Sequence, residues 1–179
     1  MKIILINVAS LDGRFTKWSG KSIYEWSSDE DYQFFNKTKA ENNLIVMGSA
    51  TFDHVRSLEK AGLKPEKERL RIVMTKNPKK YDNFAVPGEM EFSSESPKEL
   101  IKRLEKAGYK QMMLVSGGEV ANSFLKDNLV SELWLTIEPR IFGSGKSLAE
   151  GSDLDVKLKL LESRKLNPQG TILLKYKVL

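Results

Sequence analysis

The sequence contains no cysteine, which excludes a disulfide framework and thiolate chemistry and makes a cytoplasmic location the expectation. It has one histidine, His54, which cannot anchor a metal site without several converging acids, so we expect no metal. No apolar run approaches the ~18 residues of a membrane span. The N-terminal stretch MKIILINVA is too short and too early for a signal peptide and is typical of a strand.

The composition is that of an ordinary globular protein. Of the 179 residues, 40% are hydrophobic and 30% are charged. That length is enough for a substantial core, and without a linker, repeat or low-complexity segment we expect one domain, residues 1–179. The net charge of +5 suits nucleic acid, a phosphorylated cofactor or an anionic substrate. The lysines form no single block interleaved with aromatics, so we expect a small-molecule partner and no nucleic acid or membrane.

The stretch that begins at Trp26 has the features of a helix start. Ser27 and Ser28 are natural N-caps, and Ser27 with Glu30 fits a capping box. Four residues fall on one helical face: Asp31, Phe34, Phe35 and Thr38. Because the two phenylalanines must face the core, Asp31 is carried towards the interior, where a carboxylate is costly unless its charge is needed. The residues alone leave Asp31 open as a solvated first-turn acid or a binding-site carboxylate.

Apolar runs alternate with helical patterns along most of the chain. Strands are predicted at residues 2–9, 44–47, 70–74, 90–92, 111–115 and 132–138, with a weaker one at 83–86. Helices are predicted from Ser28 to near Asn42, from 49 onwards, at 97–107 and at 120–126. Residues 156–166 and 171–178 favour a closing antiparallel hairpin. We therefore predict an α/β fold, a three-layer αβα sandwich whose mixed sheet is mostly parallel.

Two strand-to-helix turns, Gly48–Thr51 and Ser116–Glu119, bring small residues to the carboxyl ends of strands, where ligands bind in open α/β sheets. The main chain at Gly117 and Gly118 can approach a pyrophosphate because no Cβ stands in the way. A tight corner explains a glycine pair equally well, and neither G-x-G-x-x-G nor a Walker A sequence is present. The residues by themselves leave the cofactor open.

Short motifs, in the right order and spacing, resemble the dihydrofolate reductase superfamily over nearly the whole chain. That superfamily also contains the riboflavin-pathway pyrimidine reductases. Residues 8–14 (VASLDGR) and 139–145 (PRIFGSG) look most like the pyrimidine-reductase branch. The resemblance implies the αβα fold named above and a reductase activity.

Other positions are similar to dihydrofolate reductase itself. The spacing of Trp26, Asp31 and Phe35 resembles that enzyme's tryptophan, pterin-binding acid and aromatic residue. Thr136, in LWLT, matches the threonine that hydrogen-bonds the acid, and Arg69 falls where the family holds the folate glutamate. The resemblance thus implies catalytic roles for Asp31, Trp26 and Thr136. It implies substrate contacts from Asp31, Phe35, Arg69, Val8, Val115 and Thr136.

The same resemblance implies NADPH as cofactor and a cis peptide at the glycine pair. It places these residues around the cofactor: Ala9, Gly48, Ser49, Thr51, Thr75, Lys76, Gly117, Gly118, Glu119 and Val120. Ser49 stands where the family often has arginine, and Glu119 stands where it can have a basic residue. Both departures leave the choice between NADPH and NADH open, although Lys76 can supply a point charge.

The leading expectation is an NADPH-dependent reductase of dihydrofolate. Asp31 would accept two hydrogen bonds from the pterin ring, Thr136 would orient Asp31, and Trp26 would help to order a water molecule. The first alternative is reduction of the ribosylaminopyrimidinone phosphate of riboflavin synthesis, which would depend on basic residues near Arg14 or Lys17. The second is a non-catalytic nucleotide-binding domain. Monomer and homodimer both stay open.

Overall fold

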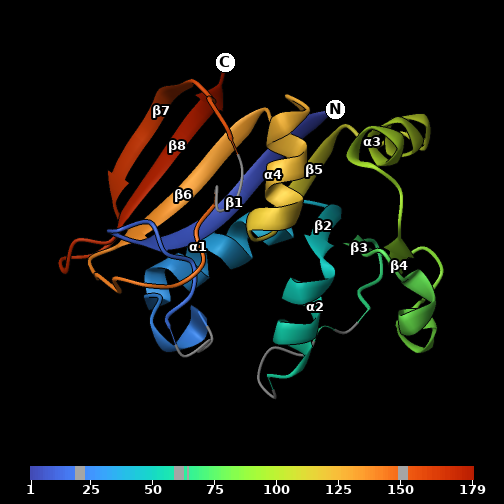
Figure 1. The fold of residues 1–179 in the computed structure, drawn as a ribbon, viewed down its shortest axis with the longest axis horizontal. Coiled ribbons are helices and arrows are strands. Elements are labelled where there is room, and N and C mark those ends of the chain that lie inside the picture. Colours follow the sequence, from blue (N-terminus) through green and yellow to red (C-terminus); the bar gives the residue numbers. More distant parts are fainter. Residues whose placement is uncertain (19–22, 59–62, 64, 149–152) are drawn as a thin grey trace.

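The computed structural model describes residues 1–18, 23–58, 63, 65–148 and 153–179 (Figure 1). In this part of the chain an eight-stranded sheet has the order β4-β3-β2-β5-β1-β6-β8-β7. Its strands are β1 (Lys2–Ser10), β2 (Leu44–Gly48), β3 (Leu70–Met74), β4 (Met90–Ser93), β5 (Gln111–Val115), β6 (Glu132–Glu138), β7 (Leu158–Lys165) and β8 (Ile172–Val178). Neighbours from β4 to β6 pair in parallel, and β8 pairs antiparallel with both β6 and β7. The predicted mixed sheet with a C-terminal hairpin is confirmed.

The helices cover both faces of the sheet. They are α1 (Asp29–Ala40), α2 (Ser49–Arg56), α3 (Pro97–Lys106) and α4 (Gly118–Lys126), with short 3-10 helices η1 (Ile23–Glu25) and η2 (Pro78–Phe84). One core cluster joins α3 and α4 to the sheet through buried residues such as Leu104 and Phe124. The other contains Phe52 of α2, with Phe34 and Phe35 of α1 packed against it. One cluster fills the space on each face of the sheet, so the fold has the three predicted layers, with helices on both sides of the sheet. No helix among the described residues is long and apolar enough to span a membrane.

Two local predictions are wrong. Of the two serines predicted as N-caps, Ser28 caps α1, and its side chain accepts a hydrogen bond from the Asp31 N–H, whereas the capping box predicted for Ser27 and Glu30 is wrong. The carboxylate of Glu30 instead accepts a hydrogen bond from Asn167 Nδ2 at 3.0 Å, so the capping box does not form. The strand predicted at 83–86 is replaced by the end of η2, because Pro78 begins a 3-10 helix that continues to Phe84.

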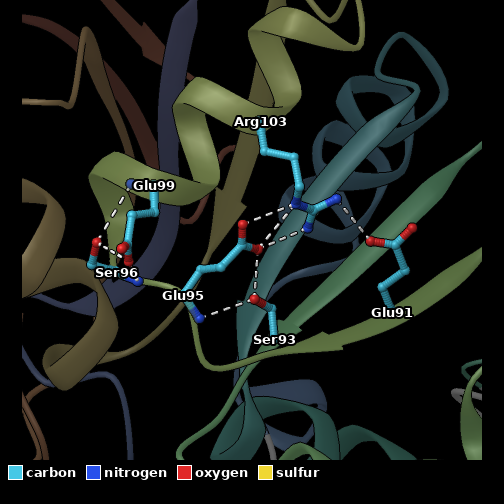
Figure 2. A network of polar contacts seen from close by, with 6 residues as sticks. All are labelled: Glu91, Ser93, Glu95, Ser96, Glu99 and Arg103. Atoms are coloured by element: carbon cyan, nitrogen blue, oxygen red, sulfur yellow. Dashed lines mark hydrogen bonds and ion pairs between the residues drawn. The ribbon is translucent and has the colours of Figure 1, made fainter.

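The connection from β4 to α3 is fixed by a network of polar contacts (Figure 2). Arg103 Nε lies 3.0 and 3.1 Å from the two carboxylate oxygens of Glu95, and Arg103 Nη1 lies 3.1 Å from Glu91 Oε2. Ser93 Oγ donates to Glu95 at 2.7 Å. Ser96 and Glu99 form a capping box at the start of α3. The network holds residues 93–95, which line the large cleft described below.

The sheet order creates a crevice at one edge. β5 lies between β1 and β2, so the chain changes direction across the sheet at this point. The helix after β2 packs on one face, and the helix after β5 packs on the other. In open α/β sheets a ligand binds in the crevice outside the carboxyl ends of two neighbouring strands whose following helices pack on opposite faces of the sheet.

Candidate active site

A cleft of about 2010 Å³ runs along the carboxyl edge of the sheet. Pockets for single small molecules measure ~300–1,000 Å³, so this cleft has room for a dinucleotide and a second ligand. Most of the residues predicted for cofactor and substrate line it: Val8, Asp31, Phe35, Gly48, Ser49, Thr51, Thr75, Lys76, Val115, Gly117, Gly118, Glu119 and Val120. Segments far apart in the sequence thus converge as predicted.

Two of the helices that start at the cleft, α2 and α4, have N-termini without a side-chain cap. The N-caps of α2 and α4 are Gly48 and Gly117, and neither makes a side-chain capping bond. The N-caps of α1 and α3 are serines whose side chains accept backbone N–H groups. Free N–H groups and the positive ends of the helix dipoles therefore point to an anionic ligand at α2 and α4.

The glycines of these turns fit a close approach by a phosphate group. A Cβ at Gly48 would meet Val120 Cγ2 at 3.0 Å and Ser116 Oγ at 3.2 Å, so glycine lets the two turns pack together. A Cβ at Gly117 would meet nothing within 4 Å, because it would project into open space beside the cleft. The residues present fit the pyrophosphate of a nicotinamide dinucleotide. The described peptide bonds are all trans, so the cis peptide expected at the glycine pair is wrong.

Lys76 and Glu119 form an ion pair on the wall of the cleft near the glycine turns. Lys76 Nζ lies 3.1 Å from Glu119 Oε1, with side chains that are 95% and 84% exposed. A pair so exposed contributes little stability and is readily exchanged for another partner. Lys76 can therefore turn to a cofactor phosphate, whereas Glu119 disfavours one.

Asp31 is a buried carboxylate on the wall of the cleft. Its residue is 8% exposed, on the face of α1 that packs on the sheet. Burial raises the pKa of Asp31 from 3.8 to about 6, a hydrogen bond from Thr136 opposes that rise, and the nearby charge of Glu138 adds to it. At neutral pH the group is mostly ionised but more basic than an exposed carboxylate. It suits a ring that presents hydrogen-bond donors.

Glu138 binds the N-cap of the helix that carries Asp31, a role that was not predicted from the sequence. This residue is 2% exposed; its Oε1 accepts hydrogen bonds from Ser28 N at 2.7 Å and Ser28 Oγ at 2.8 Å. Its Oε2 accepts one from Thr171 Oγ1 at 2.7 Å. Thr136 and Glu138 lie two residues apart on β6 and so share one face of the sheet. The two-residue spacing from Thr136 was the sequence signal that could have identified Glu138. Strand β6 therefore contacts Asp31 directly through Thr136, and it contacts the N-cap of α1 through Glu138.

Three predicted site residues lie beneath or beside the cleft. Ala9 and Thr136 are buried, and neither lines it. Trp26 is buried edge-on against Phe142, with ring centroids 5.1 Å apart. Its indole Nε1 has no hydrogen-bond partner, and the residue lines a separate cavity of about 280 Å³ beside Glu138. A role for Trp26 in ordering water stays a prediction.

The basic residues expected to bind substrate are occupied elsewhere. Arg69 donates from Nε to the Asn42 carbonyl at 2.9 Å and forms an ion pair with Glu66, so it does not reach the cleft. Arg14 donates to the Gly145 carbonyl at 3.2 Å, and Lys17 Nζ lies 5.5 Å from the ring centroid of Phe142. Neither Arg14 nor Lys17 lines the cleft. The partners of Arg14 and Lys17 lie on the segment after β6, and those of Arg69 are Asn42 and Glu66.

Two basic residues that were not predicted for the site line the cleft instead. Lys39 and Arg71 both line the cleft and both contact Glu66. Burial lowers the pKa of Lys39, and the positive charges of Arg71 and Arg69 lower it further. Glu66 thus contacts three cations, Lys39, Arg69 and Arg71, and the first and last of these line the cleft. No sequence signal separated Arg71 from Arg69, because Arg69 directly precedes β3 and Arg71 is the second residue of that strand.

Comparison with known proteins defines the family. The model of the RibD C-terminal domain matches residues 1–172. The chain belongs to the RibD C-terminal domain family. Two proteins of Bacillus subtilis (strain 168), the uncharacterized proteins YwjB and YyaP, are similar to it, with 26% and 24% identity. These matches cover 89% and 91% of this chain and 88% of each relative.

Solved structures share the fold of this RibD C-terminal domain protein. A protein from Shewanella sp. PV-4 named for riboflavin biosynthesis has a TM-score of 0.80 at 20% identity, over 100% of this chain and 99% of that one. A Thermotoga maritima diaminohydroxyphosphoribosylaminopyrimidine deaminase/5-amino-6-(5-phosphoribosylamino)uracil reductase has a TM-score of 0.78 at 16% identity. Here 99% of this chain covers 56% of that one. The predicted superfamily is confirmed, and the family is its pyrimidine-reductase branch; dihydrofolate as leading substrate is not supported.

Proposed function

We propose that this RibD C-terminal domain protein is an NADPH-dependent reductase of a phosphorylated ribosylaminopyrimidinone. The observation that carries the proposal is the buried Asp31 on the wall of the same cleft as two uncapped glycine turns. The family match and the named activity of the Thermotoga maritima protein give the substrate class. NADPH, when bound, supplies the hydride that reduces the substrate.

The side chains of this protein would bind and orient the pyrimidine ring. Ionised Asp31 accepts hydrogen bonds from the donor edge of the ring, a charge-assisted contact stronger than a neutral one. The Thr136 hydroxyl fixes the orientation of the carboxylate. Phe35, four residues beyond Asp31 on α1, lines the same cleft and packs against the ligand. A ring held in this way presents one face to the glycine turns.

The phosphate of the substrate would bind at the opposite end of the cleft. Lys39 follows Asp31 by eight residues on α1, which corresponds to a rise of ~12 Å along the helix. Arg71 projects from β3 beside it. Together they place two cationic side chains on this part of the cleft wall, and a phosphate group there is favoured by their charge.

Dihydrofolate is the second candidate. The arrangement of Asp31 with Thr136 favours it, because a pterin also presents paired donors to a carboxylate. The position of Arg69 weighs against it, since Glu66 and the Asn42 carbonyl hold that guanidinium outside the cleft.

The test is NADPH oxidation followed by absorbance, with the phosphoribosylaminopyrimidine and with dihydrofolate in turn. We expect turnover of the first substrate and little of the second. Asp31→Asn should lower kcat/KM by about 100-fold or more while the fold is retained, because the amide cannot pair ionically with the ring. Glu41→Gln, which changes an exposed acid at the C-terminal end of α1 outside the cleft, is the control. NADPH binding without reduction of either substrate would instead indicate a nucleotide-binding domain.

A further inference from the structure

Two cationic side chains of the cleft wall meet at a single carboxylate oxygen. Lys39 Nζ, from the last turn of α1, lies 3.2 Å from Oε1 of Glu66, and Arg71 Nη2, from β3, donates to the same oxygen. Both cations line the cleft, whereas Glu66 reaches them from the turn that precedes β3. Because an ammonium and a guanidinium already converge on one oxygen, the pair is arranged to bind an oxyanion.

The partners of this contact differ in their freedom to move. The side chain of Arg71 is 4% exposed, and that of Glu66 is 33% exposed. Glu66 can therefore turn into water at little cost, while a buried guanidinium that loses its anion is strongly disfavoured.

The turn that carries Glu66 does not depend on these two cations. The Arg69 N–H donates to the Glu66 carbonyl at 3.2 Å and closes the turn through the main chain. The Arg69 side chain also donates to the Asn42 carbonyl, so it keeps a partner when the carboxylate moves. The contact of Glu66 with Lys39 and Arg71 can thus be exchanged for another anion while the turn stays in place.

We propose that Glu66 competes with the phosphate of the substrate for Lys39 and Arg71, and so determines which anions the cleft accepts. A phosphate monoester carries about −1.5 to −2 charges at neutral pH and has three acceptor oxygens, so it replaces a singly charged carboxylate. A ligand that carries a carboxylate in place of the phosphate has no such advantage over Glu66. The inference rests on the proposed function in one respect, the phosphate end of the cleft.

The position of Arg71 separates the phosphate of the substrate from those of the cofactor. The glycine turns proposed for the cofactor follow the carboxyl ends of β2 and β5. Arg71 lies three residues before Met74, the last residue of β3, which corresponds to ~10 Å along the strand. A phosphate held by Lys39 and Arg71 therefore lies away from the glycine turns, and we assign it to the substrate.

The experiment is calorimetric titration of the full chain with ribose 5-phosphate, with ribose as the ligand without phosphate. Glu66→Gln should bind ribose 5-phosphate ~10-fold or more tightly than wild type, because the competing charge is removed. Arg71→Met should weaken binding by ~10-fold or more. Glu68→Gln removes an exposed acid of the same turn and is the control, with the affinity of wild type. Circular dichroism verifies that each variant folds.

Carbon-13 NMR of the glutamate carboxyl groups in wild type observes the displacement directly and needs no folded variant. Saturating ribose 5-phosphate should move the Glu66 signal to the position typical of exposed glutamates. An unmoved signal, or a Glu66→Gln protein with wild-type affinity, overturns the inference.

The same titrations distinguish this failure from a failure of the proposed function. If Arg71→Met weakens binding and Glu66→Gln has no effect, the phosphate end of the cleft stands and the role of Glu66 alone is overturned. If neither variant changes the affinity for ribose 5-phosphate, both are overturned. NADPH should bind Glu66→Gln and wild type equally; a gain in NADPH affinity would place a cofactor phosphate beside Arg71 and would also overturn the inference.

Discussion

At the scale of single residues, the site is built around a carboxylate that the fold holds at a cost. Asp31 sits on the buried side of α1, where removal from water opposes its charge, and Thr136 returns only part of that loss. Glu138 adds a second buried negative charge nearby and is itself satisfied by Ser28 and Thr171. An electrostatic cost of this kind, paid to keep a buried carboxylate ionised, is typical of a residue retained for a ligand.

The pH dependence of stability should reveal this cost. The folded-state pKa of Asp31 is about 6 against 3.8 for the unconstrained group, so the folded protein binds the proton more tightly than the unfolded chain. Its contribution to stability is therefore largest below pH 3.8 and is lost as the pH rises through 6. Asp31→Asn, which mimics the neutral acid, should be more stable than wild type at neutral pH by about 3 kcal/mol at most.

Urea unfolding of wild type and Asp31→Asn at about pH 7.5 and at about pH 4 measures that difference. The gap should be large at the higher pH and should nearly vanish at the lower one. A variant that is less stable than wild type at both values would show that the carboxylate is not destabilised by burial.

At the scale of elements, the glycines of the turns before α2 and α4 have different roles. Gly48 allows the two turns to pack together, and Gly117 faces the cleft. Gly117→Ala should fold with unchanged stability, because its Cβ meets nothing within 4 Å, but should weaken NADPH binding ~10-fold or more. Gly48→Ala should lose about 1–3 kcal/mol of stability, because its Cβ crowds Val120 and Ser116. Calorimetric titration with NADPH and thermal unfolding of each variant measure both effects. Equal NADPH affinity in wild type and Gly117→Ala would remove the second turn from the cofactor site.

The network of Figure 2 makes a different prediction for α3. Arg103 contacts Glu95 and Glu91 from a side chain that is 41% exposed, and its hydrogen bonds lower the pKa of Glu95. Arg103→Met should lower stability by about 1 kcal/mol, with a smaller loss in high salt. Lys102→Met, on the exposed neighbouring position, should change little. A loss that is identical at low and high salt would indicate that the aliphatic stem of Arg103, not its charge, carries the effect.

At the scale of the whole molecule, the proposed cofactor would contact both α2 and α4, which pack on opposite faces of the sheet, so its binding should stabilise the fold. NADPH at 100 times its Kd should add about 2.7 kcal/mol and raise Tm by about 5–10 °C. NADH should give a smaller shift, because Lys76 can pair with the additional phosphate of NADPH. Lys76→Met should remove most of the difference, as measured by thermal scans with each cofactor. Equal shifts in the wild type would assign Lys76 no part in cofactor choice.

Several features were predictable because they depend on near neighbours in the sequence. The buried strands follow from apolar runs, and the orientation of Asp31 follows from its spacing to Phe34 and Phe35. The Ser96 cap also follows from a local pattern, with Pro97 directly after it. The glycine turns converge because parallel strands end at one edge of a sheet.

By itself, then, the sequence determined the alternation of strands and helices, the buried face of α1 and the family. Only the tertiary structure decided which cation reaches the cleft: Glu66 holds Arg69 outside, while Arg71 lies within it. It also decided that Glu138 accepts hydrogen bonds from Ser28 across 110 positions of the chain. The physical reason is range. Periodicity and capping act over a few residues, whereas these contacts depend on which strands the sheet places side by side.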